Sequence, residues 1–252
     1  LNHEDLFVML DLLDSSDPIQ QPVSTAQMQE CCDHCQCATT TFTTMRCSLL
    51  RNVGRLKTFN KDDVIFWDGE KSNCIYLIVS GVVRGTKLLC DGRRQVTRFV
   101  FSGELLEYDY LPQMPFTAEA ITSVTARAVP RQVLDDAMNE RPCLRQLVMQ
   151  SILDELHETQ CLVTALARLT AQERVAQFLH NICMRSGTNN DGAFHLSMPR
   201  QDIADYLGLT IETVSRVFSK LKRENKIRLL SSSRVKILDP STFANELLLN
   251  AA

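Results

Sequence analysis

Residues 200–216 constrain the fold of this chain more than any other stretch, because they predict two short helices joined by a tight turn. Gly208 supplies the backbone freedom for the turn, and Thr210 stands where the second helix needs an N-cap. Apolar residues recur at helical spacing on both sides of the turn, which gives each helix one buried face. They are Ile203, Ala204 and Leu207 in the first helix and Val214, Val217, Phe218 and Leu221 in the second. The pattern predicts a helix-turn-helix.

The second helix keeps polar residues on its outer face, and their types suit the edges of DNA bases. Arg216 can pair bidentately with guanine, Glu212 can accept a hydrogen bond from cytosine, and Ser215 can reach either kind of edge. A surface helix with incidental charge is the alternative, but the turn, the cap and the apolar face all agree with a reader of the major groove. We therefore predict a protein that binds double-stranded DNA through these three residues. Backbone contacts are predicted for Arg200, Thr210, Thr213, Lys220 and Arg234.

The segments around this motif complete a winged DNA-binding domain. Thr170 and Glu173 form a capping-box pattern that predicts a helix extending to about residue 184. A strand over residues 194–198 and a hairpin over residues 227–237 are predicted, the hairpin being the wing. The window 195–240 holds nine Lys or Arg residues against five Asp or Glu, which is the right sign of charge for contact with phosphates.

The preceding half of the chain predicts a β-roll and a long helix. Gly69, Gly81, Gly92 and Gly103 recur every eleven or twelve residues between short β-branched and aromatic runs, a spacing typical of a sandwich or barrel. After Pro130 a short helix over residues 131–138 and a longer one from about residue 144 are predicted. The longer helix carries an apolar stripe that predicts a two-stranded coiled-coil dimer, although packing on its own β-roll is the alternative. The stripe comprises Met149, Ile152, Leu156, Thr159, Val163 and Leu166.

The N-terminal arm is acidic and rich in cysteine. Residues 1–40 contain seven acidic residues and no Lys or Arg, so residues 41–252 carry a net charge of +4 against −3 for the whole chain. We find no signal-peptide pattern and no apolar run of about 18–20 residues that would span a membrane. A cytoplasmic, reducing location is therefore expected, in which the ten cysteines are thiols or metal ligands. Five cysteines crowd into residues 31–47, where iron–sulfur, zinc and no metal all remain open.

These features resemble the CRP/FNR superfamily of transcription regulators over residues 50–240. Glu212, Ser215 and Arg216, after the turn at residues 207–210, resemble the recognition helix of the FNR/FixK branch. The resemblance implies an α+β fold with a cyclic-nucleotide-binding-like β-roll, a dimerisation helix and a winged helix-turn-helix. The domains are predicted as an arm over residues 1–48, a sensor β-roll over 49–138, a dimerisation helix over 139–169 and a DNA-binding domain over 170–252.

The resemblance also implies a function. It predicts a homodimer that binds a palindrome like TTGAT-N4-ATCAA, acts mainly as an activator with RNA polymerase as a partner, and responds to oxygen or redox state. Ile211 favours this branch, because CRP-type readers carry an Arg at that position and prefer another half-site.

Family members that bind cyclic AMP carry Gly-Glu-Leu followed by Arg-Ser/Thr-Ala. This chain has Gly103, Glu104 and Leu105, but Phe116 stands in place of the Arg that grips the phosphate, before Thr117. Because a buried phosphate without a cationic partner is unfavourable, we expect no cyclic nucleotide, and we interpret Glu104 as a structural relic and not as a ribose ligand.

In the FNR branch, three N-terminal cysteines and one β-roll cysteine hold a [4Fe–4S] cluster. Here the resemblance points to a cluster on the arm, but Arg127 occupies the position of the β-roll cysteine. The fourth ligand would then come from the arm itself, as Cys31, Cys37 or His34. The candidate metal ligands are Cys32, Cys35, Cys37 and Cys47.

No catalytic or phosphate-loop motif is present, so an enzyme is not expected. Two other classes stay open. A β-roll sensor subunit that acts on a protein partner would not need Glu212, Ser215 and Arg216. An iron–sulfur redox protein would need four well-spaced cysteines.

Overall fold

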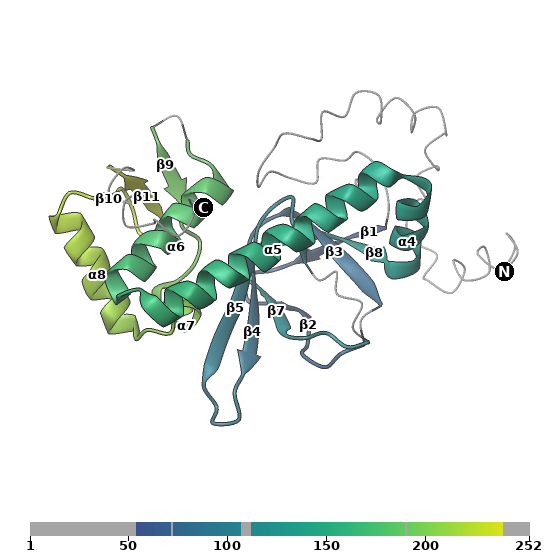
Figure 1. Ribbon diagram of the computed structural model, residues 1–252, viewed down its shortest axis with the longest axis horizontal. Coiled ribbons are helices and arrows are strands. Elements are labelled where there is room, and N and C mark those ends of the chain that lie inside the picture. The colour runs from purple at the N-terminus through teal and green to yellow at the C-terminus, as the bar shows by residue number, and fades with distance from the viewer. Residues whose placement is uncertain (1–53, 72, 107–111, 190, 239–252) are drawn as a thin grey trace, which may run out of the picture. The chain divides into compact units, whose positions relative to one another are not determined.

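A computed structural model describes residues 54–71, 73–106, 112–189 and 191–238, all of which belong to one compact unit of the chain (Figure 1). The arm and its cysteines at positions 31–47 therefore lie outside the described residues. Within them, no helix is both long and apolar enough to cross a membrane.

The first half of the described chain is a β-roll of two four-stranded antiparallel sheets, in the orders β1-β8-β3-β6 and β2-β7-β4-β5. Phe66, Ile78, Val100 and Leu106 are buried between the sheets. Gly81 turns the chain between β3 and β4 with a φ of 92°, and a Cβ there would lie 2.4 Å from the carbonyl oxygen of Ser123. The strands are β1 (Arg55–Phe59), β2 (Val64–Phe66), β3 (Cys74–Ser80), β4 (Val83–Leu88), β5 (Arg94–Val100), β6 (Leu105–Leu106), β7 (Thr117–Ala120) and β8 (Val124–Pro130).

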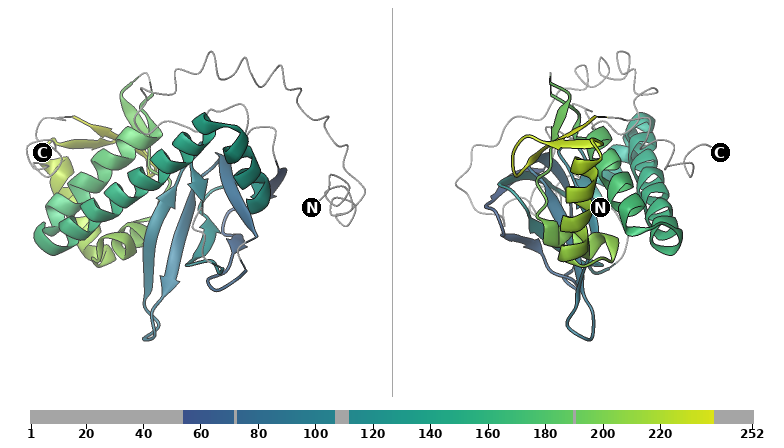
Figure 2. Two further views of the ribbon diagram at one scale, coloured as in Figure 1. Left: turned by 45° about the vertical axis from the view of Figure 1, so that its right-hand side comes forward. Right: turned by 90° about the vertical axis from the view of Figure 1, so that its left-hand side faces the viewer.

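Two helices follow the roll, α4 (Arg131–Glu140) and α5 (Pro142–Arg168). The helical structure is interrupted between them at Arg141, because Pro142 lacks an N–H and is suited to the first turn of a new helix. The N-terminal half of α5 packs on the roll through Leu144 and Val148, which share a core with Ile75 of β3. Figures 1 and 2 show α5 crossing this face of the roll, while the β4–β5 hairpin projects away from it.

The C-terminal half has the winged helix-turn-helix pattern. It comprises α6 (Ala171–Ser186), β9 (Ala193–His195), α7 (Arg200–Leu207), α8 (Ile211–Arg223), β10 (Ile227–Leu229) and β11 (Arg234–Ile237), with the strands in the order β10-β11-β9. The predicted capping box at the start of α6 is present, with Thr170 and Glu173 bonded reciprocally. The predicted strand at 194–198 is shorter, and the chain leaves it before Pro199.

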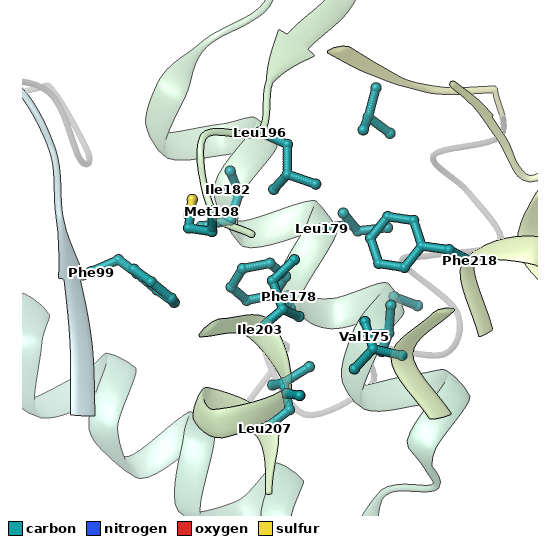
Figure 3. Packing of buried hydrophobic residues seen from close by; sticks show 14 of the residues in the cluster. Phe99, Val175, Phe178, Leu179, Ile182, Leu196, Met198, Ile203, Leu207 and Phe218 are labelled. Atoms are coloured by element: carbon teal, nitrogen blue, oxygen red, sulfur yellow. The ribbon is translucent and has the colours of Figure 1, made fainter. Parts of the chain in front are cut away.

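The core of this half continues onto the roll. Figure 3 shows Phe99 of β5 facing the cluster that contains Phe178, Ile203 and Leu207. The rings of Phe99 and Phe178 meet edge to face at 5.9 Å between centroids, and Tyr206 packs against both. The roll and the DNA-binding half are therefore joined by apolar contact as well as by the chain.

Candidate DNA-binding interface

Helix α8 is fixed by its turn, its cap and its buried face. Gly208 closes α7 in the left-handed conformation, with φ 62° and ψ 40°, a region that glycine enters without strain. The hydroxyl of Thr210 accepts a hydrogen bond from the backbone N–H of Thr213 at 3.2 Å, which satisfies one free donor of the first turn. Val214 and Leu221 are completely buried beneath the helix. The predicted helix-turn-helix is thus present in detail.

The three predicted base-reading residues lie together on the exposed face of α8. Glu212, Ser215 and Arg216 are all exposed, and they occupy the first half of the helix. Hydrogen bonds from its own backbone and from the Thr210 side chain lower the pKa of Glu212, so it is an ionised acceptor near neutral pH. The Glu212 carboxylate and the Arg216 guanidinium lie one helical turn apart, so they can contact two neighbouring base pairs.

The predicted backbone-contact residues are placed more variously. The guanidinium carbon of Arg200 lies 3.3 Å from the centroid of the Phe218 ring, and burial lowers the pKa of this half-buried Arg. Thr213 is half-buried and Thr210 is exposed at the cap, while Lys220 is exposed and lies 3.8 Å from Glu224. Arg234 on the wing bonds Asp191 at 2.6 Å, so part of its charge is neutralised within the protein. Three exposed cations that our sequence analysis did not name as contacts are Lys222, Arg223 and Arg228.

Helix α5 has an exposed apolar seam, and its register differs in part from the predicted stripe. Met149, Leu153, Leu156 and Val163 are each at least half exposed. Ile152 instead packs against the α5–roll core, and Leu166 lies beside Gly208 of the helix-turn-helix. Thr159 is exposed next to the seam. Three residues of the predicted stripe, Met149, Leu156 and Val163, therefore share the exposed seam with Leu153, and their role in a dimer stays a prediction.

The interior of the roll is filled with aromatic rings at the position expected for the nucleotide phosphate. Phe116 is buried 5.6 Å from Phe66 between ring centroids. The Arg98 guanidinium lies 5.7 Å from the centre of the Phe116 ring, and a Cβ at Gly85 would meet that ring at 2.9 Å. Glu104 accepts hydrogen bonds from the Phe101 backbone at 2.9 Å and from Arg185 at 2.6 Å. These bonds give Glu104 a structural role between the segment after β5 and α6.

The predicted metal ligands Cys32, Cys35, Cys37 and Cys47 are outside the described residues. Across the described ranges, no group of three or more His, Cys, Asp or Glu residues is placed to hold a metal ion. Arg127 lies on β8, paired with Leu56 and Leu77 of the neighbouring strands. Its guanidinium cannot ligate a metal cation, so the roll provides no ligand at this position.

Two family models match the chain. The Crp-like helix-turn-helix domain matches residues 173–245, and the cyclic nucleotide-binding domain matches residues 56–141. The nitrogen fixation regulation protein FixK of Azorhizobium caulinodans is 40% identical over 75% of this chain and 77% of its own length. The anaerobic regulatory protein of Haemophilus influenzae is 33% identical over 77% of this chain and 80% of its own length. The solved structure of FixK2 from Bradyrhizobium japonicum superposes with a TM-score of 0.72 at 33% identity, covering 79% of this chain and 98% of that one.

The chain therefore belongs to the CRP/FNR family of transcription regulators, in its FNR/FixK-like branch. It is a regulator of the FixK/FNR type with a helix-turn-helix DNA-binding domain. The predicted family and fold class are confirmed.

Proposed function

We propose that the protein acts as a homodimer that recognises an inverted repeat like TTGAT-N4-ATCAA. The observation that carries the proposal is the shared exposure of Glu212, Ser215 and Arg216 on one face of α8. In each half-site, Arg216 pairs with a guanine and Glu212 accepts from the cytosine of a neighbouring pair. A two-fold symmetric dimer then reads two half-sites related by the same symmetry.

The dimer forms through the exposed seam of α5, with Met149, Leu153, Leu156 and Val163 from each copy. Four large apolar side chains on one face of a helix favour burial against a matching surface. A second copy supplies that surface without any further partner. The proposed domains keep the predicted bounds: an arm over residues 1–48, a β-roll over 49–138, a dimerisation helix over 139–169 and a DNA-binding domain over 170–252.

The roll works without a cyclic nucleotide. Phe116 supports this, because its ring replaces the expected Arg and packs against Phe66 inside the roll. A phosphate placed there would meet the Phe116 ring, and the nearby Arg98 guanidinium is already paired with Glu155 at 2.7 Å, so the phosphate would lose its hydration with little compensation.

The arm is the proposed sensor of oxygen or redox state, holding a [4Fe–4S] cluster through Cys32, Cys35, Cys37 and Cys47. All four ligands come from the arm in this proposal, because Arg127 stands where the roll would have contributed one. An anaerobic absorption spectrum with iron, sulfide and zinc analysis tests it. Loss of iron and sulfide in Cys32→Ser, with Cys90→Ser as the control, supports a cluster. Zinc without sulfide, or no metal in the intact protein, contradicts it.

The regulator is proposed to act mainly as an activator that contacts RNA polymerase, inside the cytoplasm. The support is its similarity to a nitrogen fixation regulation protein and to an anaerobic regulatory protein.

Binding of the palindrome is tested by fluorescence anisotropy on three duplexes: the full repeat, one half-site alone and a scrambled repeat. The proposal expects strong preference for the full repeat, and a further loss of affinity as salt rises, because phosphate contacts release counterions. Equal affinity for all three duplexes would contradict it. Lys220→Ala serves as a matched variant, since loss of a phosphate contact should weaken all three duplexes alike.

A further inference from the structure

The DNA-binding domain is joined to the β-roll by ion pairs that meet at one buried carboxylate. Asp202, in the first turn of α7, has only 1% of its side chain exposed. Its two carboxylate oxygens accept from Arg84 of β4 at 2.7 Å and from Arg94 of β5 at 2.5 Å. Arg94 also bonds Asp205, one turn further along α7, at 2.6 Å. We call Arg84, Arg94, Asp202 and Asp205 the interdomain clasp.

One half of the clasp is held in place within the roll. Glu119 of β7 bonds the Nε of Arg84 at 2.8 Å, which leaves Nη1 directed at Asp202. Burial works against the Arg84 charge, but the hydrogen bonds that Arg84 donates to Glu119 and Asp202 outweigh it and raise the pKa of Arg84. The Asp202 carboxylate would be costly to bury without its Arg partners. It meets those partners only while α7 lies against the roll. The clasp therefore favours one docked arrangement over a loosely sliding one.

A second ion-pair cluster fixes the same domain at another helix. Arg185 of α6 bonds Glu104 of the roll at 2.6 Å, Glu158 of α5 at 3.0 Å and the carbonyl oxygen of Phe99 at 2.9 Å. Burial works against the Arg185 charge, but Glu104 and Glu158 raise its pKa. Two helices of the domain are thus anchored at separate places, which restrains rotation as well as translation.

The clasp leaves the DNA-reading face open. Glu212, Ser215 and Arg216 remain exposed while Asp202 is fully paired. The ion pairs therefore leave the exposed face of α8 accessible to DNA while they fix the orientation of its domain.

We propose that the interdomain clasp sets the separation of the two recognition helices in the dimer, and so makes the protein selective for the spacing between half-sites. Arg84, Arg94 and Asp202 are then positioning residues for DNA recognition, although they lie away from the reading face. This inference rests on the proposed function, since it needs a dimer that reads an inverted repeat.

The physical basis is the pitch of DNA. One added or removed base pair moves a half-site by roughly 3.4 Å along the axis and rotates it by about 35° around the axis. A DNA-binding domain that is docked rigidly on the roll cannot follow that change, whereas a domain tethered only at the α5–α6 joint can. Loosening the clasp should therefore reduce discrimination between spacers more than it reduces base recognition.

The test measures dissociation constants of the full-length protein for the repeat with a four-base-pair spacer and for repeats one base pair shorter and longer. The double variant Arg84→Met with Arg94→Met removes the cations that the roll contributes to the clasp. The variant Asp202→Asn removes the charge of the buried carboxylate on α7. Both variants should bind the best repeat about tenfold more weakly. The ratio of the dissociation constants for the altered spacers to that for the four-base-pair spacer should also fall by about tenfold, in line with typical coupling energies of neighbouring residues. Both should retain the wild-type half-site consensus.

Two controls separate positioning from general damage. Arg93→Met removes an exposed ion pair with Asp91 at the tip of the same hairpin and should change neither quantity. Glu119→Gln breaks the contact within the roll but leaves both links to Asp202, so it should have the smaller effect. Thermal melting of each variant checks that the roll is folded.

The outcomes are distinct. If the intact protein binds no inverted repeat, the proposed function fails. If it does bind and the clasp variants lose affinity equally for every spacer, or bind more tightly, the positioning role is overturned. An effect of Asp202→Asn without any effect of the double Arg variant would leave Asp202 as a local stabiliser of α7 and would equally refute the clasp.

Discussion

Helices α8 and α5 are both amphipathic, yet the sequence defines the faces of only one of them. In α8 the buried residues form a single stripe against one core, and every other position except the half-buried Thr213 is exposed. In α5 apolar residues lie on two sides, because Val148 and Ile152 pack on the roll while Leu153 and Leu156 point away from it. Periodicity identifies an apolar face, but it does not say how a helix divides its apolar residues between two neighbours.

The largest effect is expected from a charge in the seam. Leu156→Asp would bring two carboxylates together in the dimer interface, where unpaired charges are strongly unfavourable. The variant should sediment as a monomer and lose at least about a hundredfold in affinity for the palindrome, equivalent to roughly 3 kcal/mol. His157→Asp, adjacent on the helix, is the charge-matched control and should disturb dimerisation less. A dimeric Leu156→Asp protein at low micromolar concentration would place the interface elsewhere.

The neighbouring pair Ile152 and Leu153 separates the two faces of α5. Ile152→Ala should lower the free energy of unfolding by about 2 kcal/mol, because it removes packing against the roll, and the loss should not depend on protein concentration. Leu153→Ala should weaken the dimer, so that its apparent stability loss shrinks as concentration rises. Urea unfolding at two concentrations distinguishes them. The reverse assignment would restore the stripe as first predicted.

On α8, removal of the reading guanidinium should alter specificity more than fold. Arg216→Ala should weaken binding to the palindrome by about 1–3 kcal/mol and relax the choice of base at its guanine. Melting of the free protein should stay close to that of the wild type, because the side chain is exposed. Competition binding against duplexes substituted at each half-site position measures this. An undiminished preference for guanine would assign the contact to another residue.

A smaller effect is expected at the start of the DNA-binding domain. Thr170→Ala removes the cap of α6 and should lower stability by about 1 kcal/mol near neutral pH. Backbone and side-chain hydrogen bonds from Thr170 depress the pKa of Glu173 below its ordinary 4.5. This part of the capping energy is therefore present above pH 4.5 and is lost as the pH falls through the lower folded-state value. The difference in unfolding free energy between the wild type and Thr170→Ala should therefore shrink as the pH falls through that range. The difference between the wild type and Thr159→Ala on α5 should show no such pH dependence.

The smallest expected effect is none. Cyclic AMP should not change the melting temperature or the affinity for DNA, because Phe116 fills the phosphate position. A ligand at a hundred times its dissociation constant would stabilise the protein by about 2.7 kcal/mol, so binding would be plain. The operator duplex is the positive control. A saturable shift with cyclic AMP would contradict our interpretation of the roll.

The sequence predicted most successfully what is determined locally. The turn at Gly208, the cap at Thr210 and the capping box at Thr170 depend on residues within a few positions, and all three are present. The β-roll followed from regular turn spacing and from the family resemblance, and the match to the cyclic nucleotide-binding domain over residues 56–141 confirms it.

What the sequence missed depends on distant contacts. Asp202 belongs to a short polar stretch and would be expected to face water, yet it is buried because Arg84 and Arg94 reach it from 118 and 108 residues away. The wing residue Arg234 stays a predicted phosphate contact, but its ion pair with Asp191, 43 residues earlier, was not foreseen. Neither partner could be identified from spacing along the chain.

The central claim, that the exposed face of α8 reads DNA in a symmetric dimer, is tested most directly by selection from random duplexes with the full-length protein, kept anaerobic. The account predicts recovery of an inverted repeat of TTGAT half-sites separated by four base pairs, and loss of constraint at one symmetry-related position per half-site when Arg216→Ala is used instead. Recovery of no palindrome, or of the same palindrome with both proteins, would contradict it.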